Sequence, residues 1–284
     1  MSGYGWGTVL YESASLDALA IELRRGPCPD SLPGSRRVLR WLSVGENSLL
    51  VRYPNQWSLL VEDGCRATLQ WPESSEVPTW IVDSWVVPFA MQQRGILCLH
   101  ATAMDVNGRT IAIAGDSGAG KSTTAMALRQ RGHSVLVDDV TLLDQSGDKP
   151  VFIPFRRRLH LLRDAADAVG VDFDEHTPLV AFPEKVGVSL DEFDDRSDRV
   201  LNALVVLESR DDVSDLVVNH PTGGQAVAVV QVLAGRQTTG PAILGPTRYF
   251  ELLTHLCKST TVVHIQRPKH SSTLDDVVAI VEGV

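Results

Sequence analysis

A glycine-rich stretch near the middle of the chain has the spacing of a phosphate-binding loop. Residues 115–122 read GDSGAGKS and fit the pattern G-x-x-x-x-G-K-[ST]. Glycines let successive backbone N–H groups approach phosphate oxygens, and the positive N-terminal end of a following helix adds to the attraction. Lys121 can bridge the β- and γ-phosphates, and the Ser122 hydroxyl can ligate Mg²⁺. We therefore expect ATP, or another nucleoside triphosphate, to bind along Gly115, Asp116, Ser117, Gly118, Ala119, Gly120, Lys121, Ser122 and Thr123.

Two adjacent aspartates, Asp138 and Asp139, end the apolar run that follows the expected helix after this loop. The second strand of a β–α–β unit usually runs parallel to the first, so its carboxyl end lies at the same edge as the loop. Consecutive side chains diverge. One carboxylate can therefore hold Mg²⁺, directly or through water, while the other accepts a proton from an attacking hydroxyl. The alternative is that one aspartate caps a turn and the other is solvated.

A histidine is brought to the loop by the register of an expected hairpin. Asn107-Gly108 lies between two apolar runs, which is a strong signal for a two-residue β-turn. If Val106 pairs with Arg109, counting back along both strands places His100 opposite Gly115. We expect His100 to orient an aspartate or to contact phosphate. A bulge would break this register, and an isolated strand histidine is otherwise a core or surface residue.

Four further basic residues are weaker candidates for contacts with phosphate or substrate. Arg156 and Arg158 belong to a run of three arginines, Lys185 lies in an acidic stretch, and Arg267 follows an expected strand. Arginine is suited to bidentate contacts with phosphate. The alternative for all four is a solvated surface charge.

The surrounding elements indicate a mixed α/β fold in two parts. We expect a β-rich N-terminal subdomain over residues 1–95, which ends in a helix that Pro88 kinks or splits. A P-loop catalytic domain follows over 96–284, where apolar runs of strand and helix period alternate. It also contains an expected helix at 159–170, a loop-rich stretch at 171–198, and a segment at 222–234 that fits either a helix or a strand.

Bulk composition narrows the class of protein. The chain has 284 residues, 44% of them hydrophobic and 21% charged, with a net charge of −9. This acidic balance argues against a nucleic-acid partner, and the apolar runs are too short to span a membrane. The first residues lack the basic and apolar regions of a signal peptide, and the four cysteines are isolated in sequence. We expect a cytoplasmic protein with no membrane partner.

The motifs together resemble the catalytic core of HPr kinase/phosphorylase over about residues 97–143. This resemblance implies a fold like phosphoenolpyruvate carboxykinase and ATP- and Mg²⁺-dependent phosphorylation of a serine on a protein. It makes His100, Lys121 and Asp138 catalytic, with Asp138 the general base, and Ser122 and Asp139 the Mg²⁺ ligands. The separate N-terminal domain and the HPr-docking signature of that family have no counterpart here. The family is hexameric, which leaves a homo-oligomer open for this chain.

Most of the chain is similar to the shorter HPr kinase-like proteins encoded with lasso peptide biosynthesis. The similarity is carried by Tyr4-Gly5-Trp6, by Arg94, Gly95, Leu97, Leu99, His100 and Ala101, and by Arg267-Pro268. It implies phosphorylation of a serine, typically C-terminal, on a ribosomal precursor peptide.

Three functions remain to be weighed. The first is an ATP-dependent kinase acting on a serine of a peptide or protein. The second is a small-molecule kinase or a carboxykinase-like phosphotransferase. The third is a nucleotide-sensing regulatory module, against which His100 and the two aspartates argue.

Overall fold

The structure is a computed structural model in which most of the sequence is described. The described residues are 19–53, 56–71, 79–155, 158–168, 172, 178–179, 182–189, 199–235, 239–269 and 273–284. The chain divides into two compact units, Met1–Ile96 with Thr238–Pro246, and Leu97–Gln237 with Thr247–Val284. The Tyr4-Gly5-Trp6 motif and Arg156 lie outside the described residues. In the described ranges, no helix is long and apolar enough to cross a membrane.

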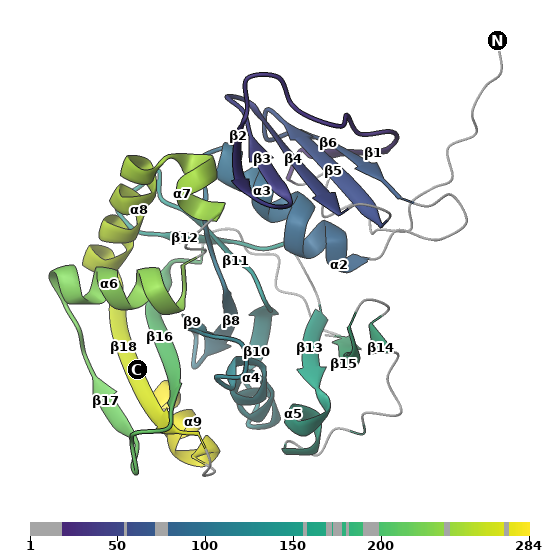
Figure 1. The fold of residues 1–284 in the computed structure, drawn as a ribbon. Helices are drawn as coiled ribbons and strands as arrows, with labels where there is room; N and C mark the ends of the chain where they lie inside the picture. Colours follow the sequence, from purple (N-terminus) through teal and green to yellow (C-terminus); the bar gives the residue numbers. More distant parts are fainter. Residues whose placement is uncertain are drawn as a thin grey trace. The chain divides into compact units, whose positions relative to one another are not determined.

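The first unit is built on a six-stranded sheet (Figure 1). Its order is β1-β6-β5-β4-β3-β2, in which β1 pairs parallel with β6 and all other neighbours are antiparallel. Short apolar runs separated by turn residues favour such hairpins, and the β-rich expectation is confirmed here. The strands are β1 (Glu22–Arg25), β2 (Arg36–Leu39), β3 (Leu42–Val44), β4 (Ser48–Tyr53), β5 (Trp57–Glu62) and β6 (Arg66–Gln70).

A helical segment follows this sheet, and it changes pitch before Pro88. It consists of α2 (Thr79–Ile81), the π-helical turn η1 (Val82–Val86) and α3 (Val87–Gln93). Proline has no N–H to donate to the preceding turn, so a wider turn immediately before it relieves the conflict. Gly95 follows the helix at φ 84°, a left-handed conformation that suits glycine after a helix end. Where the sequence predicted that Pro88 kinks or splits the helix, the helical segment continues without a break and changes pitch.

Aromatic side chains join the helical segment to the sheet of this unit. The ring of Trp85 meets those of Trp41 and Trp57 edge-on, with centroids 5.0 and 5.3 Å apart. Such pairs each contribute about 0.5–1.5 kcal/mol beyond simple burial. A further short helix that the sequence did not indicate, α7 (Thr239–Leu244), packs on α3.

The second unit is organised by a mixed six-stranded sheet with the order β10-β8-β9-β16-β18-β17. β9, β16 and β18 are parallel, whereas β8 and β17 run antiparallel to their neighbours. β10 is antiparallel to β8 and therefore runs in the direction of β9, so the two carboxyl ends share one edge. The strands are β8 (Ala101–Val106), β9 (Arg109–Gly115), β10 (Ser134–Val137), β16 (Leu201–Arg210), β17 (Val217–Asn219) and β18 (Thr261–Pro268).

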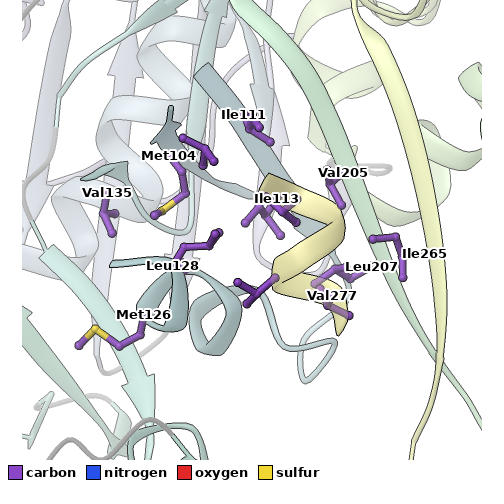
Figure 2. Packing of buried hydrophobic residues seen from close by; sticks show 14 of the residues in the cluster. Met104, Ile111, Ile113, Met126, Leu128, Val135, Val205, Leu207, Ile265 and Val277 are labelled. Atoms are coloured by element: carbon purple, nitrogen blue, oxygen red, sulfur yellow. The ribbon is translucent and has the colours of Figure 1, made fainter. Parts of the chain in front are cut away.

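The core of this unit lies between one face of the sheet and two helices, α4 (Lys121–Gln130) and α9 (Leu274–Gly283). Figure 2 shows Ile113, Leu207 and Ile265 of the strands packed with Leu128 of α4 and Val277 of α9. Full burial of such a side chain stabilises the fold by about 1.5–3 kcal/mol. Because strand side chains alternate, the neighbours of Leu207 and Ile265 in sequence point to the opposite face.

The opposite face is covered in part by α6 (Gly223–Leu233), which packs on β16, and the chain continues through α8 (Pro246–Ser259). The stretch 222–234, for which the sequence allowed a helix or a strand, is therefore helical. Its buried residues Ala226, Val227 and Val230 are spaced one and three apart, as on one side of a helix.

Two small sheets complete the unit, and they differ from the helix expected at 159–170 and from the loop-rich stretch expected at 171–198. One has the order β12-β11-β7 and consists of β7 (Leu97–Leu99), β11 (Thr141–Asp144) and β12 (Val151–Ile153). The other has the order β13-β15-β14 and consists of β13 (Arg158–Leu162), β14 (Pro178–Leu179) and β15 (Phe182–Ser189). The expected helix at 159–170 is wrong in its first half, since only α5 (Arg163–Ala168) is helical. Antiparallel pairing of β13 with β15, inside the expected loop, overrides local helix propensity.

Candidate active site

The hairpin that carries His100 has the register expected from its turn. Asn107 and Gly108 have φ values of 54° and 78°, as a tight type I′ turn requires. Val106 pairs with Arg109, and the ladder continues to Ala101 opposite Ala114. His100 immediately precedes this ladder, at the level of Gly115. Its N–H donates to the carbonyl of Ala234, 2.9 Å away, which fixes the backbone at this point.

The glycine-rich loop joins β9 to α4, as the sequence predicted. Gly115, Gly118 and Gly120 have φ values of 144°, 83° and 97°, and a Cβ on Gly115 would overlap the carbonyl of Leu207. Gly120 is the N-cap residue of α4, so no side chain occupies the position where a cap would bond the first N–H groups of the helix. The first N–H groups of a helix have no intrahelical partner and carry the positive end of its dipole. The loop and the helix together therefore form a site for an anion.

Lys121 is folded back onto the loop. Its Nζ donates to the carbonyls of Gly115 and Asp116, at 2.8 and 3.1 Å, and the residue is 8% exposed. These bonds hold the ammonium group inside the curve of the loop, where β- and γ-phosphate oxygens would meet it.

Asp138 is buried beside the loop. It is 2% exposed, and its Oδ1 accepts a 2.6 Å hydrogen bond from the Thr102 hydroxyl. The Ser122 hydroxyl lies 3.5 Å from the same oxygen. Thr102 was missed in the sequence, although a polar residue two positions after His100 in an apolar strand was a usable signal. The carboxylate of Asp138 is thus fixed next to the hydroxyl expected to hold a metal ion.

Asp139 occupies a strained turn and contacts His100. Its φ is 69°, and the N–H of Val140 donates to the carbonyl of Asp138 at 2.9 Å, which makes Asp139 the centre of a γ-turn of the rarer hand. Such strain costs on the order of 1–3 kcal/mol and is concentrated at functional sites. Oδ1 of Asp139 lies 3.2 Å from Nε2 of His100, and both side chains are about one-third exposed, at 31% and 38%. This pair is open to solvent, in contrast to Asp138.

The two aspartates, expected as the base and as a Mg²⁺ ligand, have different surroundings. Asp138, expected as the base, is buried against Thr102 and Ser122, where a solvent-borne hydroxyl has little access. Asp139, expected as the Mg²⁺ ligand, is the accessible carboxylate and has a histidine beside it. Both residues lie at the carboxyl edge next to the loop.

Hydroxyl and carboxylate oxygens such as those of Ser122 and Asp138 are hard ligands that fit Mg²⁺. This ion usually takes one or two protein carboxylates and completes its octahedron with water and phosphate oxygens. In the part of the chain that the structure describes, no group of three or more His, Cys, Asp or Glu side chains could hold a metal ion.

Of the four basic residues considered for contacts with phosphate or substrate, Arg267 is the one that the described structure places beside the loop. It projects from the end of β18, and its Nη1 donates to the carbonyl of Ala119 at 3.3 Å. A Cβ on Gly120 would lie 2.5 Å from the same Nη1, so the loop accommodates the guanidinium by having a glycine there. Burial lowers the pKa of Arg267. Within the described ranges its buried Nε has no hydrogen-bond partner, so the guanidinium keeps donor capacity beside the loop.

The remaining basic candidates are not placed at the site. Arg156 lies outside the described residues, and the side chains of Arg158 and Lys185 are not described. Their backbones belong to one ladder, where Arg158 pairs with Ser189 and Lys185 with Leu162, at its opposite ends.

Comparison with known proteins points to one family for the segment that carries these residues. Residues 93–157 match the model of the HPr Serine kinase C-terminal domain. The HPr kinase/phosphorylase of Clostridium beijerinckii is 30% identical over 129 residues, 45% of this chain and 39% of that protein. That of Mycoplasmopsis pulmonis is 45% identical over 51 residues, 18% of this chain and 16% of that protein. The chain thus spans well under half the length of the relatives it matches.

The chain can also be aligned with a solved structure, the Hpr(Ser) kinase/phosphatase from Coxiella burnetii. The alignment covers 66% of this chain and 91% of that chain, at 14% sequence identity and a TM-score of 0.34. This likeness is too slight to carry an argument. The HPr kinase/phosphorylase resemblance is confirmed by the family and sequence matches, and the segment concerned contains His100, the loop and both aspartates.

Proposed function

We propose, from the relationship of residues 93–157 to the C-terminal domain of HPr serine kinases, that the protein is an ATP-dependent serine kinase. One observation carries the proposal. A complete phosphate loop shares the carboxyl edge of one sheet with a carboxylate next to its Ser122 and with an accessible His100–Asp139 pair. A nucleotide-binding protein needs only the first of these features, whereas transfer to a hydroxyl also needs a group that takes the proton.

The loop and its neighbours would bind ATP by its phosphates. Backbone N–H groups of the loop and of the first turn of α4, including that of Thr123, would donate to phosphate oxygens. Lys121 would exchange its two carbonyl acceptors for the β- and γ-phosphates, and Arg267 would add a second cation from β18. Ser122 and Asp138 would hold Mg²⁺, which when bound neutralises charge that develops on the phosphates.

His100 and Asp139 would serve the acceptor side. The serine oxygen attacks the γ-phosphorus, the bond from that phosphorus to the β–γ bridging oxygen breaks, and ADP leaves. Asp139 would accept the hydroxyl proton, and His100, 3.2 Å from it, would fix the orientation of the carboxylate. Asp138 is the less accessible carboxylate for a substrate hydroxyl, since it is buried and already accepts a hydrogen bond from Thr102.

We further propose that the acceptor is a peptide, with the C-terminal serine of a lasso-type precursor as the most specific candidate. The support for this acceptor is the resemblance of the whole chain to lasso-associated kinases, carried by motifs such as Arg94-Gly95 and Arg267-Pro268. A cytoplasmic location and a homo-oligomer belong to the same proposal.

The decisive experiment is phosphate transfer from γ-labelled ATP to a synthetic peptide that ends in serine. We expect labelling that requires Mg²⁺ and is absent when the terminal serine is replaced by alanine. Lys121→Ala should abolish nucleotide binding, whereas Lys258→Ala, at an exposed position of α8, is the matched control and should bind normally.

Two outcomes would overturn the proposal. Unchanged ATP affinity in Lys121→Ala would contradict the assignment of the loop. Tight ATP binding with transfer only to small alcohols, and not to any peptide or protein serine, would favour a small-molecule kinase.

A further inference from the structure

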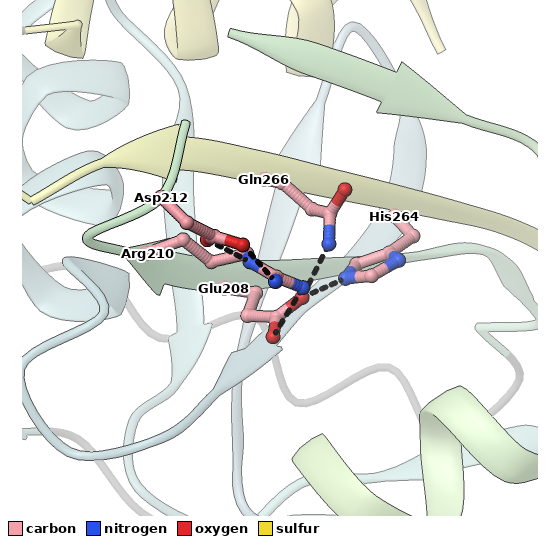
Figure 3. Close-up of polar contacts among 5 residues, drawn as sticks. All are labelled: Glu208, Arg210, Asp212, His264 and Gln266. Atoms are coloured by element: carbon pink, nitrogen blue, oxygen red, sulfur yellow. Dashed lines mark hydrogen bonds and ion pairs between the residues drawn. The ribbon is translucent and has the colours of Figure 1, made fainter. Parts of the chain in front are cut away.

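A polar cluster lies on the side of β16 and β18 that faces away from α4. It is centred on Glu208, whose Oε2 accepts hydrogen bonds from His264 Nε2 and from Gln266 Nε2, both at 2.9 Å (Figure 3). Arg210 Nη1 lies 3.6 Å from the other oxygen of Glu208 and forms a two-bond ion pair with Asp212. His264 is 8% exposed, whereas the side chains of Glu208, Arg210 and Asp212 are 26%, 36% and 66% exposed, so the cluster extends from a buried histidine to the solvent.

The cluster and Arg267 are on opposite faces of the same strand end. Gln266 pairs with Glu208 across the parallel ladder, and Arg267 pairs with Ser209. Side chains alternate along a strand, so Gln266 points away from the core while Arg267 points, like Ile265, to the side of α4. This is why Arg267 reaches the carbonyl of Ala119.

The strand end at Arg267 is held mainly from β16. On its other side, the ladder with β17 stops at Gln266, which pairs with Val217. From β16 come the bond of Glu208 to the Gln266 side chain and a 3.0 Å backbone bond from Lys269 N–H to the carbonyl of Arg210. Residues 266 and 269 are thus both tied to β16, and Arg267 lies between them.

We infer that Glu208 is a positioning residue for Arg267. Its carboxylate fixes Gln266 and His264 on one face, and this sets the position of the backbone from which the Arg267 guanidinium reaches the phosphate loop on the other face. Glu208 itself touches neither nucleotide nor acceptor. The inference rests on the proposed function, in which Arg267 binds a phosphate of ATP.

A double-mutant cycle between Glu208→Ala and Arg267→Ala tests this role, with the Michaelis constant for ATP, kcat and Tm measured for each variant. Loss of a hydrogen bond to a charged group predicts that Arg267→Ala raises KM for ATP by about tenfold or more. Glu208→Ala should raise KM in the same direction by a smaller factor, with little change in kcat. In the Arg267→Ala background, Glu208→Ala should change KM no further, since non-additivity marks residues that act through one another.

Two companion variants separate positioning from a general loss of structure. Glu208→Gln retains an oxygen that can accept from Gln266 and should restore most of the wild-type KM. Asp212→Ala removes the other carboxylate of the cluster, which bonds only Arg210 among these residues, and should leave KM unchanged.

The possible failures are distinguishable. If Glu208→Ala raises KM equally with and without Arg267, Glu208 acts by another route and the inference is overturned. If Arg267→Ala leaves ATP binding and transfer unchanged, the assigned role of Arg267 in the proposed function is itself wrong. If Lys121→Ala also binds ATP normally, the whole nucleotide site is wrong.

Discussion

A histidine lies beside a carboxylate near each end of α4, and the comparison shows what turns such a pair into a site. At the N-terminal end, Nε2 of His100 lies 3.2 Å from Asp139. Just beyond the C-terminal end, Nε2 of His133 lies 3.1 Å from Glu282 of α9. In distance and in chemistry the two pairs are nearly alike.

Their surroundings differ. Glu282 also accepts from Arg131 Nη1 at 3.1 Å, and Arg131 in turn binds Asp275, so the pair belongs to a surface network that joins two helices. Asp139 instead lies in a strained γ-turn next to an anion-binding loop. The carboxylate of the preceding residue, Asp138, lies beside Ser122 of that loop. The pair alone is therefore weak evidence for catalysis. Strain and a neighbouring phosphate site make the first pair a functional candidate.

The largest expected effect comes from removing the carboxylate of Asp139. Asp139→Asn tolerates the left-handed conformation, because asparagine adopts it readily, and should fold normally. Loss of the proton acceptor should lower kcat for phosphate transfer by about 10²–10⁴-fold, while the affinity for ATP stays close to wild type. Steady-state kinetics with nucleotide titration measure both quantities.

Asp138→Asn is the matched comparison. It should weaken the dependence of nucleotide binding on Mg²⁺, because it changes the carboxylate next to Ser122. The opposite pattern, with transfer lost in Asp138→Asn and kept in Asp139→Asn, would restore the assignment that the sequence alone suggested.

Sequence patterns sufficed for the parts of the site that depend on local geometry. The Asn107-Gly108 turn fixed the hairpin register that brings His100 to the loop, and the G-x-x-x-x-G-K-S spacing indicated the loop itself. The aspartates followed from the topology of a β–α–β unit. Each of these inferences needs only a turn type, a period of two residues or a strand direction.

Non-local contacts were out of reach for the same reasoning. The position of Thr102 two residues after His100 marks it as a candidate, but no local pattern identifies Asp138 as its partner or shows that a left-handed turn exposes Asp139. The strand β15 was missed because its run from Phe182 to Ser189 is stabilised by pairing with β13. Its neighbouring acidic residues suggested a loop, and pairing energy from another segment is invisible to a local window.

A contact distant in sequence provides the next prediction, of intermediate size. Gly235 forms an isolated antiparallel β-bridge with Leu99, and the carbonyl of Ala234, the residue before it, accepts a hydrogen bond from the N–H of His100. A Cβ on Gly235 would overlap the hydroxyl of Tyr249 on α8. Gly235→Ala should therefore displace the backbone that anchors His100 and lower kcat by about tenfold, as expected for a misplaced catalytic group.

Nucleotide affinity should be unchanged in Gly235→Ala, because the phosphate loop has no part in this contact. Adding Tyr249→Phe removes the hydroxyl and should recover part of the lost kcat, while Tyr249→Phe alone stays near wild type. No loss of kcat in Gly235→Ala would mean that the position of His100 does not depend on α6 and α8.

The smallest effect is expected at the other end of α4. The hydrogen bond with His133, followed by the neighbouring Arg131, lowers the pKa of Glu282. A carboxyl whose pKa is depressed on folding stabilises the protein above its ordinary pKa of about 4.3, and this stabilisation disappears as the pH falls through the lower folded value. Glu282→Gln should therefore lower Tm slightly at pH 7, by at most about 3 °C, since exposed ion pairs contribute little. The difference in Tm from wild type should shrink as the pH is lowered below about 4.

Phosphate transfer at pH 7 should not change, and a marked loss of kcat in Glu282→Gln would show that the two ends of α4 are coupled after all.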